Sequence, residues 1–207
     1  MAEGDPGYCY DGASLNDSHA CLLPALDRFL DSARPARVFE VGCGNGSVAN
    51  WMASRGIEVS GIDFSESGIA QARRAYPELQ LAVGSAYDDL SKVFGQFPVV
   101  ISLEVIEHLY FPRRFARSVF DLLEPGGTAF ISIPFHGYLK NLALALTGRM
   151  DAHFTALWDG GHIKFFSEQT LGALLREAGF GTIRFLRVGR VAPLAKSMVA
   201  IASKPVA

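Results

Sequence analysis

Three ionisable side chains follow the apolar run 97–103. Glu104, Glu107 and His108 lie within five positions of one another. If the chain starts a helical turn there, residues at i, i+3 and i+4 project to one side. Two carboxylates and an imidazole suit a hard or intermediate divalent ion, Mg²⁺ or Mn²⁺ before Zn²⁺. A metal needs more than three ligands, and His162 in GGHIKFF is the candidate for a fourth.

The same residues also permit chemistry without a metal. Glu107 can cap or pair locally, and His108 can act alone as a general base or stand as an ordinary pocket histidine. Without a metal, the role of His162 would be to anchor the loop on which it lies through a hydrogen bond. We therefore take His108 and Glu104 as candidate catalytic residues, beside the metal interpretation.

A glycine-rich loop joins an early strand to a helix. Gly42, Gly44 and Gly46 are spaced two apart in VFEVGCGNGSVANW. Glycine lets the backbone approach a ligand closely, and the helix start offers free N–H groups. In doubly wound folds such loops bind nucleotides. The spacing is tighter than in a dinucleotide fingerprint, and Glu40 would repel phosphate.

The second strand ends in GIDFSES, which supplies an acidic residue a short way along the chain from the glycine loop. Asp63 follows the loop by about the spacing at which a carboxylate holds ribose hydroxyls. The ligand implied is a nucleoside without a phosphate pair. This argues against a nicotinamide-dependent oxidoreductase, which needs the wider glycine spacing. A non-catalytic module with a relict pocket would be expected to have lost the loop or Asp63.

These residues must be positioned by alternating strands and helices, which predict a doubly wound α/β fold with a mostly parallel sheet. The last two strands have no helix between them, so we expect one to run antiparallel at the edge. Segment 124–127 reads as a turn. Strands are expected at 37–41, 58–62, 79–83, 97–103, 128–134, 182–188 and 196–202, and helices at 16–32, 46–54, 65–76, 112–123 and 167–178.

Length and charge limit the remaining choices. The chain has 207 residues and a formal net charge of −2, which favours one domain, 1–207, and no nucleic-acid partner. The three cysteines match no zinc or disulfide framework, and we expect reduced thiols in a cytoplasmic protein. The first residues do not read as a signal peptide, and no run is long enough to cross a bilayer, so no stable membrane insertion is expected.

Four motifs in order, EVGCGNG, GIDFSE, VISLEVIEHL and LEPGG, resemble the class I S-adenosylmethionine-dependent methyltransferases. The resemblance implies a Rossmann-like, seven-stranded sheet with a reversed final hairpin, and an N-terminal cap helix within 1–34. Ser85 departs from the acidic residue that many members carry there. The cofactor-binding residues that the resemblance implies are Glu40, Gly42, Gly44 and Gly46 for the methionine part, Asp63 for the ribose, Phe64, Ser85 and Ala86 near the adenine, and Leu103 with Glu104 below the sulfonium.

The motif EVIEH is similar to a metal-binding motif in two branches of that family. These are the ubiquinone-biosynthesis O-methyltransferases and the small-RNA 2′-O-methyltransferases. Both resemblances imply Glu104, Glu107 and His108 as ligands. In the RNA enzymes a later histidine completes the site, and His162 is its counterpart here. An RNA substrate would need a basic groove or an added domain, and we see neither in the sequence.

Segment 135–166 is too long for a routine connection between a strand and a helix. It is rich in aromatic residues and contains a short apolar helix in YLKNLALALTGRM. We interpret it as a lid over the acceptor; a membrane-surface contact and a dimer face are the alternatives. Tyr138, His153 and Trp158 are its candidate acceptor contacts.

The sequence thus predicts a methyltransferase that uses S-adenosylmethionine to O-methylate a small hydroxylated molecule, such as a catechol, a diol or a sugar-like compound. The most specific form of this prediction is that Mg²⁺ or Mn²⁺ assists the methyl transfer. The alternatives are a metal-independent N- or C-methyltransferase of a small molecule and, less favoured, an RNA 2′-O-methyltransferase. The protein is expected to be a monomer or a homodimer.

Overall fold

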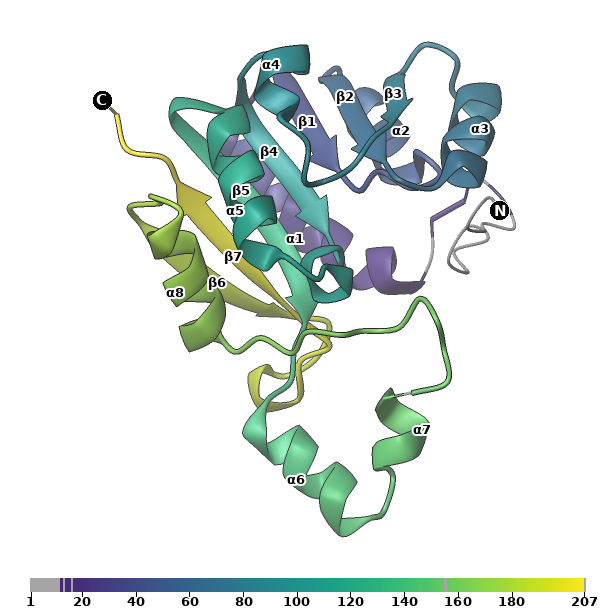
Figure 1. Ribbon diagram of the computed structural model, residues 1–207, viewed down its shortest axis with the longest axis vertical. Coiled ribbons are helices and arrows are strands. Elements are labelled where there is room, and N and C mark those ends of the chain that lie inside the picture. The colour runs from purple at the N-terminus through teal and green to yellow at the C-terminus, as the bar shows by residue number, and fades with distance from the viewer. Residues whose placement is uncertain (1–11, 13, 16, 155, 207) are drawn as a thin grey trace.

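A seven-stranded sheet forms the centre of the computed structural model, which describes residues 12, 14–15, 17–154 and 156–206. The strand order is β3-β2-β1-β4-β5-β7-β6 (Figure 1). The strands are β1 (Arg37–Val41), β2 (Glu58–Asp63), β3 (Gln80–Val83), β4 (Phe97–Leu103), β5 (Leu123–Pro134), β6 (Ile183–Val188) and β7 (Ser197–Ser203).

Helices cover both faces of this sheet, as its apolar strands require. One core layer joins the sheet to α1 (Asp17–Ala33), α2 (Ser47–Ala53) and α3 (Glu66–Ala75). The opposite layer joins it to α4 (Leu90–Phe94), α5 (Pro112–Leu122) and α8 (Glu168–Glu177). Successive residues of a strand serve opposite layers, so Val38 packs in the first and Phe39 in the second.

The chain reverses direction across the sheet between β1 and β4. β1 pairs in parallel with β2 on one side and with β4 on the other. In open α/β sheets this switch point leaves a crevice outside the carboxyl ends of the strands, where ligands bind. The glycine loop after β1 and the ionisable residues after β4 both lie at this edge.

The expected fold class is confirmed, with corrections at two places. β7 runs antiparallel to both β5 and β6, but it lies between them, and β6 forms the edge. Segment 124–127, expected as a turn, belongs to β5 as an irregular stretch. Leu123 pairs with Phe97 while Thr128 pairs with Val99, so the register shifts across these residues. The short elements α4 and η2 (Ala192–Leu194) were not predicted.

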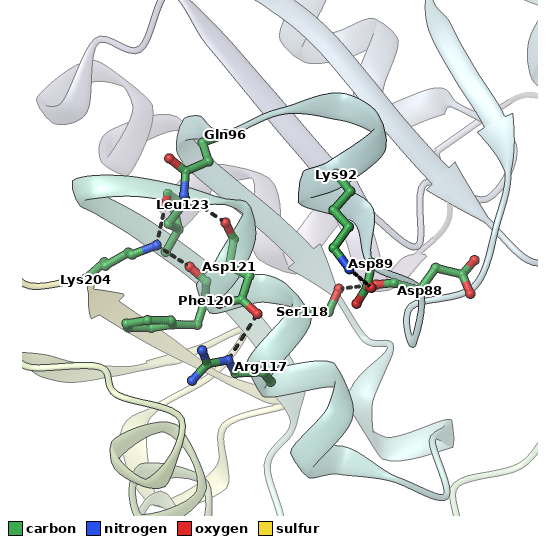
Figure 2. Close-up of polar contacts among 10 residues, drawn as sticks. All are labelled: Asp88, Asp89, Lys92, Gln96, Arg117, Ser118, Phe120, Asp121, Leu123 and Lys204. Atoms are coloured by element: carbon green, nitrogen blue, oxygen red, sulfur yellow. Dashed lines mark hydrogen bonds and ion pairs between the residues drawn. The ribbon is translucent and has the colours of Figure 1, made fainter.

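Polar side chains tie α5 to its neighbours at its carboxyl end and within the helix. Lys204, just after β7, donates hydrogen bonds to the carbonyl oxygens of Phe120 and Leu123 at 2.9 and 2.7 Å (Figure 2). Ser118 donates to the carbonyl oxygen of Asp88 at 3.2 Å. Lys204 therefore closes the carboxyl end of α5, where carbonyl groups lack helical partners.

The inserted segment projects from the carboxyl edge of the sheet. It carries α6 (Tyr138–Leu146) and α7 (Met150–Phe154), which lie apart from the sheet in Figure 1. Neither helix has a buried residue. The returning chain is tied to the body because the backbone N–H groups of Ile163 and Lys164 both donate to the carbonyl oxygen of Glu107 at 2.9 Å.

Candidate active site

The glycine loop is shaped by contacts with β2 and with the turn after β4. The N–H groups of Gly42 and Cys43 donate to the carbonyl oxygen of Ile62 at 2.8 and 3.0 Å. Gly42 has a φ of 84°, and a Cβ atom there would lie 2.3 Å from Val105 Cγ2. Only glycine satisfies both the left-handed backbone and this close approach. The loop therefore packs directly on the segment that carries Glu104 and Glu107.

Asp63 ties the same loop to the end of β2. Its Oδ2 accepts from the N–H of Gly44 at 2.8 Å, and its Oδ1 accepts from the N–H of Ser65 at 2.9 Å. Asp63 is buried, so these bonds hold the carboxylate in one orientation at the ligand edge. The predicted ribose contact and the predicted glycine loop thus meet in space.

Glu40 lies beneath the loop as an unusual buried acid. Burial raises its pKa to about 8, and the Asp63 carboxylate adds to the rise. Its Oε2 has no hydrogen-bond partner among the described residues. An unsatisfied carboxylate costs free energy in the interior unless a cation reaches it. Glu40 therefore fits the cationic amino group of a methionine-type ligand, which would supply that partner.

The other predicted cofactor residues follow the carboxyl ends of β2, β3 and β4. Phe64 is about half exposed at 52 %, which leaves its ring open for a planar ligand. The Ser85 hydroxyl accepts from the N–H of Tyr87 at 3.2 Å, so it stabilises its own turn. Ala86 is half-buried beside the core, and Leu103 is buried at the end of β4.

Three of the four predicted metal ligands come together. Glu107, His108 and His162 each place a ligand atom within 4.8 Å of the others. Glu104 is not a member of this group. It has a φ of 55°, so the helical turn begins only with the 3-10 helix η1 (Ile106–His108), and its Oε1 accepts from the Ser132 hydroxyl at 3.0 Å.

The carboxylate of Glu107 is isolated from donors. It is 1 % exposed, and apart from its own backbone N–H neither oxygen has a hydrogen-bond partner in the described chain. Burial raises its pKa well above the ordinary value, and the Glu104 carboxylate adds to the effect. Burial also raises the pKa of Glu104 to about 7, although the Ser132 and Ser197 hydroxyls oppose the shift.

The two histidines face this carboxylate in neutral form. The Nδ1 of His108 donates to the carbonyl oxygen of Gly161 at 3.2 Å, which leaves the lone pair on Nε2, 4.0 Å from Glu107 Oε1. Burial lowers the pKa of His108, and it lowers that of His162 to about 4, helped by His108. Their ring centroids are 4.8 Å apart.

This donor set fits a divalent cation. A buried carboxylate without donors among the described residues and two imidazoles are all competent ligands for such an ion. Glu107, His108 and His162 are therefore the residues that would hold a metal here. Glu104 lies near enough to influence Glu107 electrostatically, with one oxygen engaged by Ser132.

The insertion contributes a pocket that sequence reasoning only partly foresaw. Of the predicted acceptor contacts, Tyr138 points to solvent at 77 % exposure, whereas Trp158 lies 6.2 Å from His108 and His153 lies 6.0 Å from His136 between ring centroids. The pocket has a volume of about 460 Å³. Its lining residues are His136, Asn141, Phe154, Ala156, His162 and Phe165. The density of aromatic residues between positions 135 and 166 was the only signal for them.

Comparison with known proteins decides the family. A model described as a methyltransferase domain matches residues 17–184, which is most of the chain. The chain belongs to this methyltransferase family. Its cofactor is S-adenosylmethionine, in agreement with the nucleoside-binding features of the glycine loop and Asp63.

Named relatives of this methyltransferase are bacterial. A protein of Ruegeria pomeroyi, named ubiquinone biosynthesis O-methyltransferase, is 34% identical over 74% of this chain and 64% of its own length. A protein of the same name from Thiobacillus denitrificans is 34% identical over 78% of this chain and 72% of its own. The chain therefore spans slightly less than two thirds of the length of some relatives.

A solved structure shares the fold of this methyltransferase. Magnesium protoporphyrin IX methyltransferase from Synechocystis, determined with bound S-adenosylhomocysteine, superposes with a TM-score of 0.68 at 18% identity. The match covers 88% of this chain and 81% of that protein.

Among the described residues, no helix is both long and apolar enough to span a membrane.

Proposed function

We propose that this methyltransferase transfers the methyl group of S-adenosylmethionine to a hydroxyl oxygen of a small molecule, and that a divalent metal assists. The preferred acceptor is a catechol or a vicinal diol, which offers two neighbouring oxygens. The observation that supports the proposal most is the buried Glu107 carboxylate without donors beside His108 and His162. The names of the relatives support an oxygen acceptor.

The cofactor half holds the methyl donor in place. Glu40 would bind the amino group of the methionine part, and Asp63 would bind the ribose, at the crevice where β1 and β4 diverge. Because the glycine loop contacts Val105, the donor and the ionisable cluster lie on adjoining segments. Positioning of the acceptor oxygen in line with the methyl group is then the main contribution of the protein to the rate.

The acceptor half would hold the hydroxyl group. Glu107, His108 and His162 would ligate the metal, which when bound lowers the pKa of a coordinated hydroxyl and orients its oxygen. His108 is held in the required tautomer by the Gly161 carbonyl, so that Nε2 carries the lone pair. The acceptor hydroxyl gives up its proton to solvent water. Methyl transfer then forms an O–C bond and breaks the C–S bond, and the electron pair of the C–S bond stays on sulfur.

Calorimetric titration tests the metal. We expect Mg²⁺ or Mn²⁺ to bind the protein saturated with S-adenosylhomocysteine with one-to-one stoichiometry. Glu107→Gln keeps the shape of the side chain but removes its charge, and it should weaken binding at least about tenfold, the range seen when metal-site partners are lost. Glu177→Gln changes an exposed glutamate of α8 that pairs with Arg113 and is not among the clustered ligands; it is the control and should bind as the wild type does.

Product analysis tests the reaction. Catechol should yield a monomethyl ether with loss of activity after chelation, whereas phenol, with a single oxygen, should react far more slowly. Equal rates with catechol and phenol, or activity unaffected by chelator and by Glu107→Gln, would contradict metal assistance and leave His108 Nε2 as the base. Methylation of amines but not of any hydroxyl compound would contradict an oxygen acceptor.

A further inference from the structure

The clustered residues Glu107, His108 and His162 come from two separate parts of the chain. Glu107 and His108 belong to η1, which follows β4 in the body of the molecule, that is, the sheet and the helices that cover it. His162 belongs to the return loop, residues 160–164, which leads the chain back from α6 and α7. An ion held by all three side chains would therefore join the insertion to the body.

The return loop is attached to the body at the same turn. The backbone N–H groups of residues 163–164 both donate to the carbonyl oxygen of Glu107 at 2.9 Å. The Nδ1 of His108 donates to the carbonyl oxygen of Gly161 at 3.2 Å. The turn that carries two candidate ligands is thus also the point at which the return loop is held. An interaction that fixes one of these segments therefore fixes the other.

The helices of the insertion contribute little to the packed interior. Neither α6 nor α7 has a buried residue, and α6 leaves Tyr138 and Leu146 largely exposed. Segments with few buried apolar contacts are the first to open locally. The chain enters the insertion through the buried Phe135, whose N–H donates to the carbonyl oxygen of Lys196 at 2.9 Å. The entry is thus fixed beside the sheet, and we expect opening to start at the return loop.

His162 also lines the pocket of the insertion, so its position affects both helices. Asn141 of α6 and Phe154 of α7 line the same pocket. Phe154 meets Phe165, which follows the return loop, edge to face at 5.1 Å between ring centroids. If His162 is fixed on the body, it restrains these walls, and its release loosens both helices.

We propose that His162 is a metal-dependent anchor of the insertion: when His162, Glu107 and His108 ligate one divalent cation together, the return loop is fixed to the body and opening of α6 and α7 is suppressed. This inference rests on the proposed function, because it uses the same candidate metal site, and it gives that site a second, conformational role. Opening of the return loop removes one of the three protein ligands. By linkage, the factor by which opening weakens metal binding is also the factor by which bound metal suppresses opening.

Hydrogen–deuterium exchange followed by mass spectrometry tests the anchor without catalysis. The full chain, saturated with S-adenosylhomocysteine, would be measured with Mg²⁺ at about 100 times its dissociation constant and again with a chelator. We expect the backbone amides of α6 and α7 to exchange at least about tenfold more slowly with Mg²⁺, the smaller effect seen when a metal-site partner is lost. These amides belong to no candidate ligand, and those of α8, in the body, should exchange alike in both conditions.

Two histidine variants assign the effect to its residue. His162→Ala should abolish the slowing in α6 and α7, and it should weaken Mg²⁺ binding by about the factor of protection that is lost. His153→Ala removes another half-buried histidine of the insertion, outside the three clustered residues, and should keep the ratio of exchange rates with and without Mg²⁺. Unchanged exchange of α8 in both variants would show that the body remains folded.

Calorimetry on the same samples separates the possible results. If Mg²⁺ binds the wild type but leaves exchange of α6 and α7 unchanged, or if His162→Ala retains the full slowing, this inference is overturned and the proposed function stands. If Mg²⁺ slows exchange as expected but no hydroxyl compound is methylated, the proposed function is overturned and the anchor stands. If neither Mg²⁺ nor Mn²⁺ binds, the anchor and metal assistance are both overturned.

Discussion

At the scale of single residues, the candidate site consists of acids that the fold keeps out of water. Glu40 and Glu107 are both buried, and both have raised pKa values because the charged forms lack compensation. Such groups lower the stability of the ligand-free protein, and a bound cation stabilises their charged forms. Glu40 would meet an ammonium group and Glu107 a metal ion, so their burial serves binding more than stability.

The pH dependence of stability tests this view of Glu40. Its pKa rises from 4.5 to about 8 on folding, so between these values the folded state retains a proton that the unfolded state has lost. The favourable contribution is therefore complete below about pH 4.5 and is lost as pH rises to 8. In the ligand-free protein, Glu40→Gln should flatten the fall in free energy of unfolding between pH 5 and pH 8.

Urea unfolding at several pH values measures the effect. Glu58→Gln, an exposed glutamate of the neighbouring strand β2, is the matched control and should keep the slope of the wild type. Parallel pH profiles for the wild type and Glu40→Gln would show that the proton on Glu40 does not govern stability in this range.

At the scale of elements, the sequence predicted those with strong local signals. β4 is an almost continuous apolar run, and α3 begins at the expected cap, Ser65, whose hydroxyl accepts from the N–H of Gly68 at 3.1 Å. The five-residue helix α4 escaped prediction because it is too short to show a period. Local sequence does not indicate where a final hairpin joins a sheet. The position of β7 between β5 and β6 was therefore not predicted.

The candidate site was predictable to a similar degree. The residues proposed to bind the cofactor lie at or just after strand ends, and strand ends are visible in sequence. Glu104 was expected to share a helical face with Glu107, but its left-handed backbone breaks the turn before η1. His136 and Asn141 were not among the predicted acceptor contacts, because they come beside His162 only through the return of the insertion.

Lys204 offers a test of how an element is held. Its ammonium satisfies two carbonyl groups at the end of α5 (Figure 2). Lys204→Met should lower the free energy of unfolding by about 1 kcal/mol, the usual net value of such hydrogen bonds.

Denaturant unfolding of two lysine variants supplies the measurement. Lys92→Met removes the exposed pair with Asp89 seen in the same view and should leave the free energy of unfolding close to that of the wild type. Similar effects of the two substitutions would contradict a capping role for Lys204.

At the scale of the whole molecule, cofactor binding and acceptor binding are divided between parts of different stability. The sheet and its two helical layers contain the buried core, whereas α6 and α7 contribute no buried residue to it. The insertion is held chiefly at its ends, by continuity with β5 and by the bonds of Ile163 and Lys164 to the Glu107 carbonyl. Selectivity for the acceptor would thus reside in a part that folding of the body does not need.

Excision of the insertion tests this division. Residues 138–160 would be replaced by a short glycine–serine linker between Gly137 and Gly161. We expect the melting temperature to change by less than about 4 °C, equivalent to about 1 kcal/mol for a chain of this size. Binding of S-adenosylhomocysteine should persist within about twofold, and methyl transfer to the acceptor should be lost.

Thermal unfolding and calorimetry on the excised protein decide the matter. Loss of both stability and cofactor binding would show that the insertion is part of the folding unit. Full retention of methyl transfer would show that the acceptor binds elsewhere.

Gly42 and Val105 approach so closely that neither position is free to vary alone over evolutionary time. A larger residue at 42 would collide with the valine, and the shifted valine would carry Glu104 and Glu107 with it. Among descendants of a common ancestor, glycine should therefore persist at 42, because a smaller side chain at 105 would relieve the collision but not the strain of the left-handed backbone. The donor motif and the acceptor motif, whose Gly42 and Val105 stand 63 positions apart along the chain, would be inherited as a single unit.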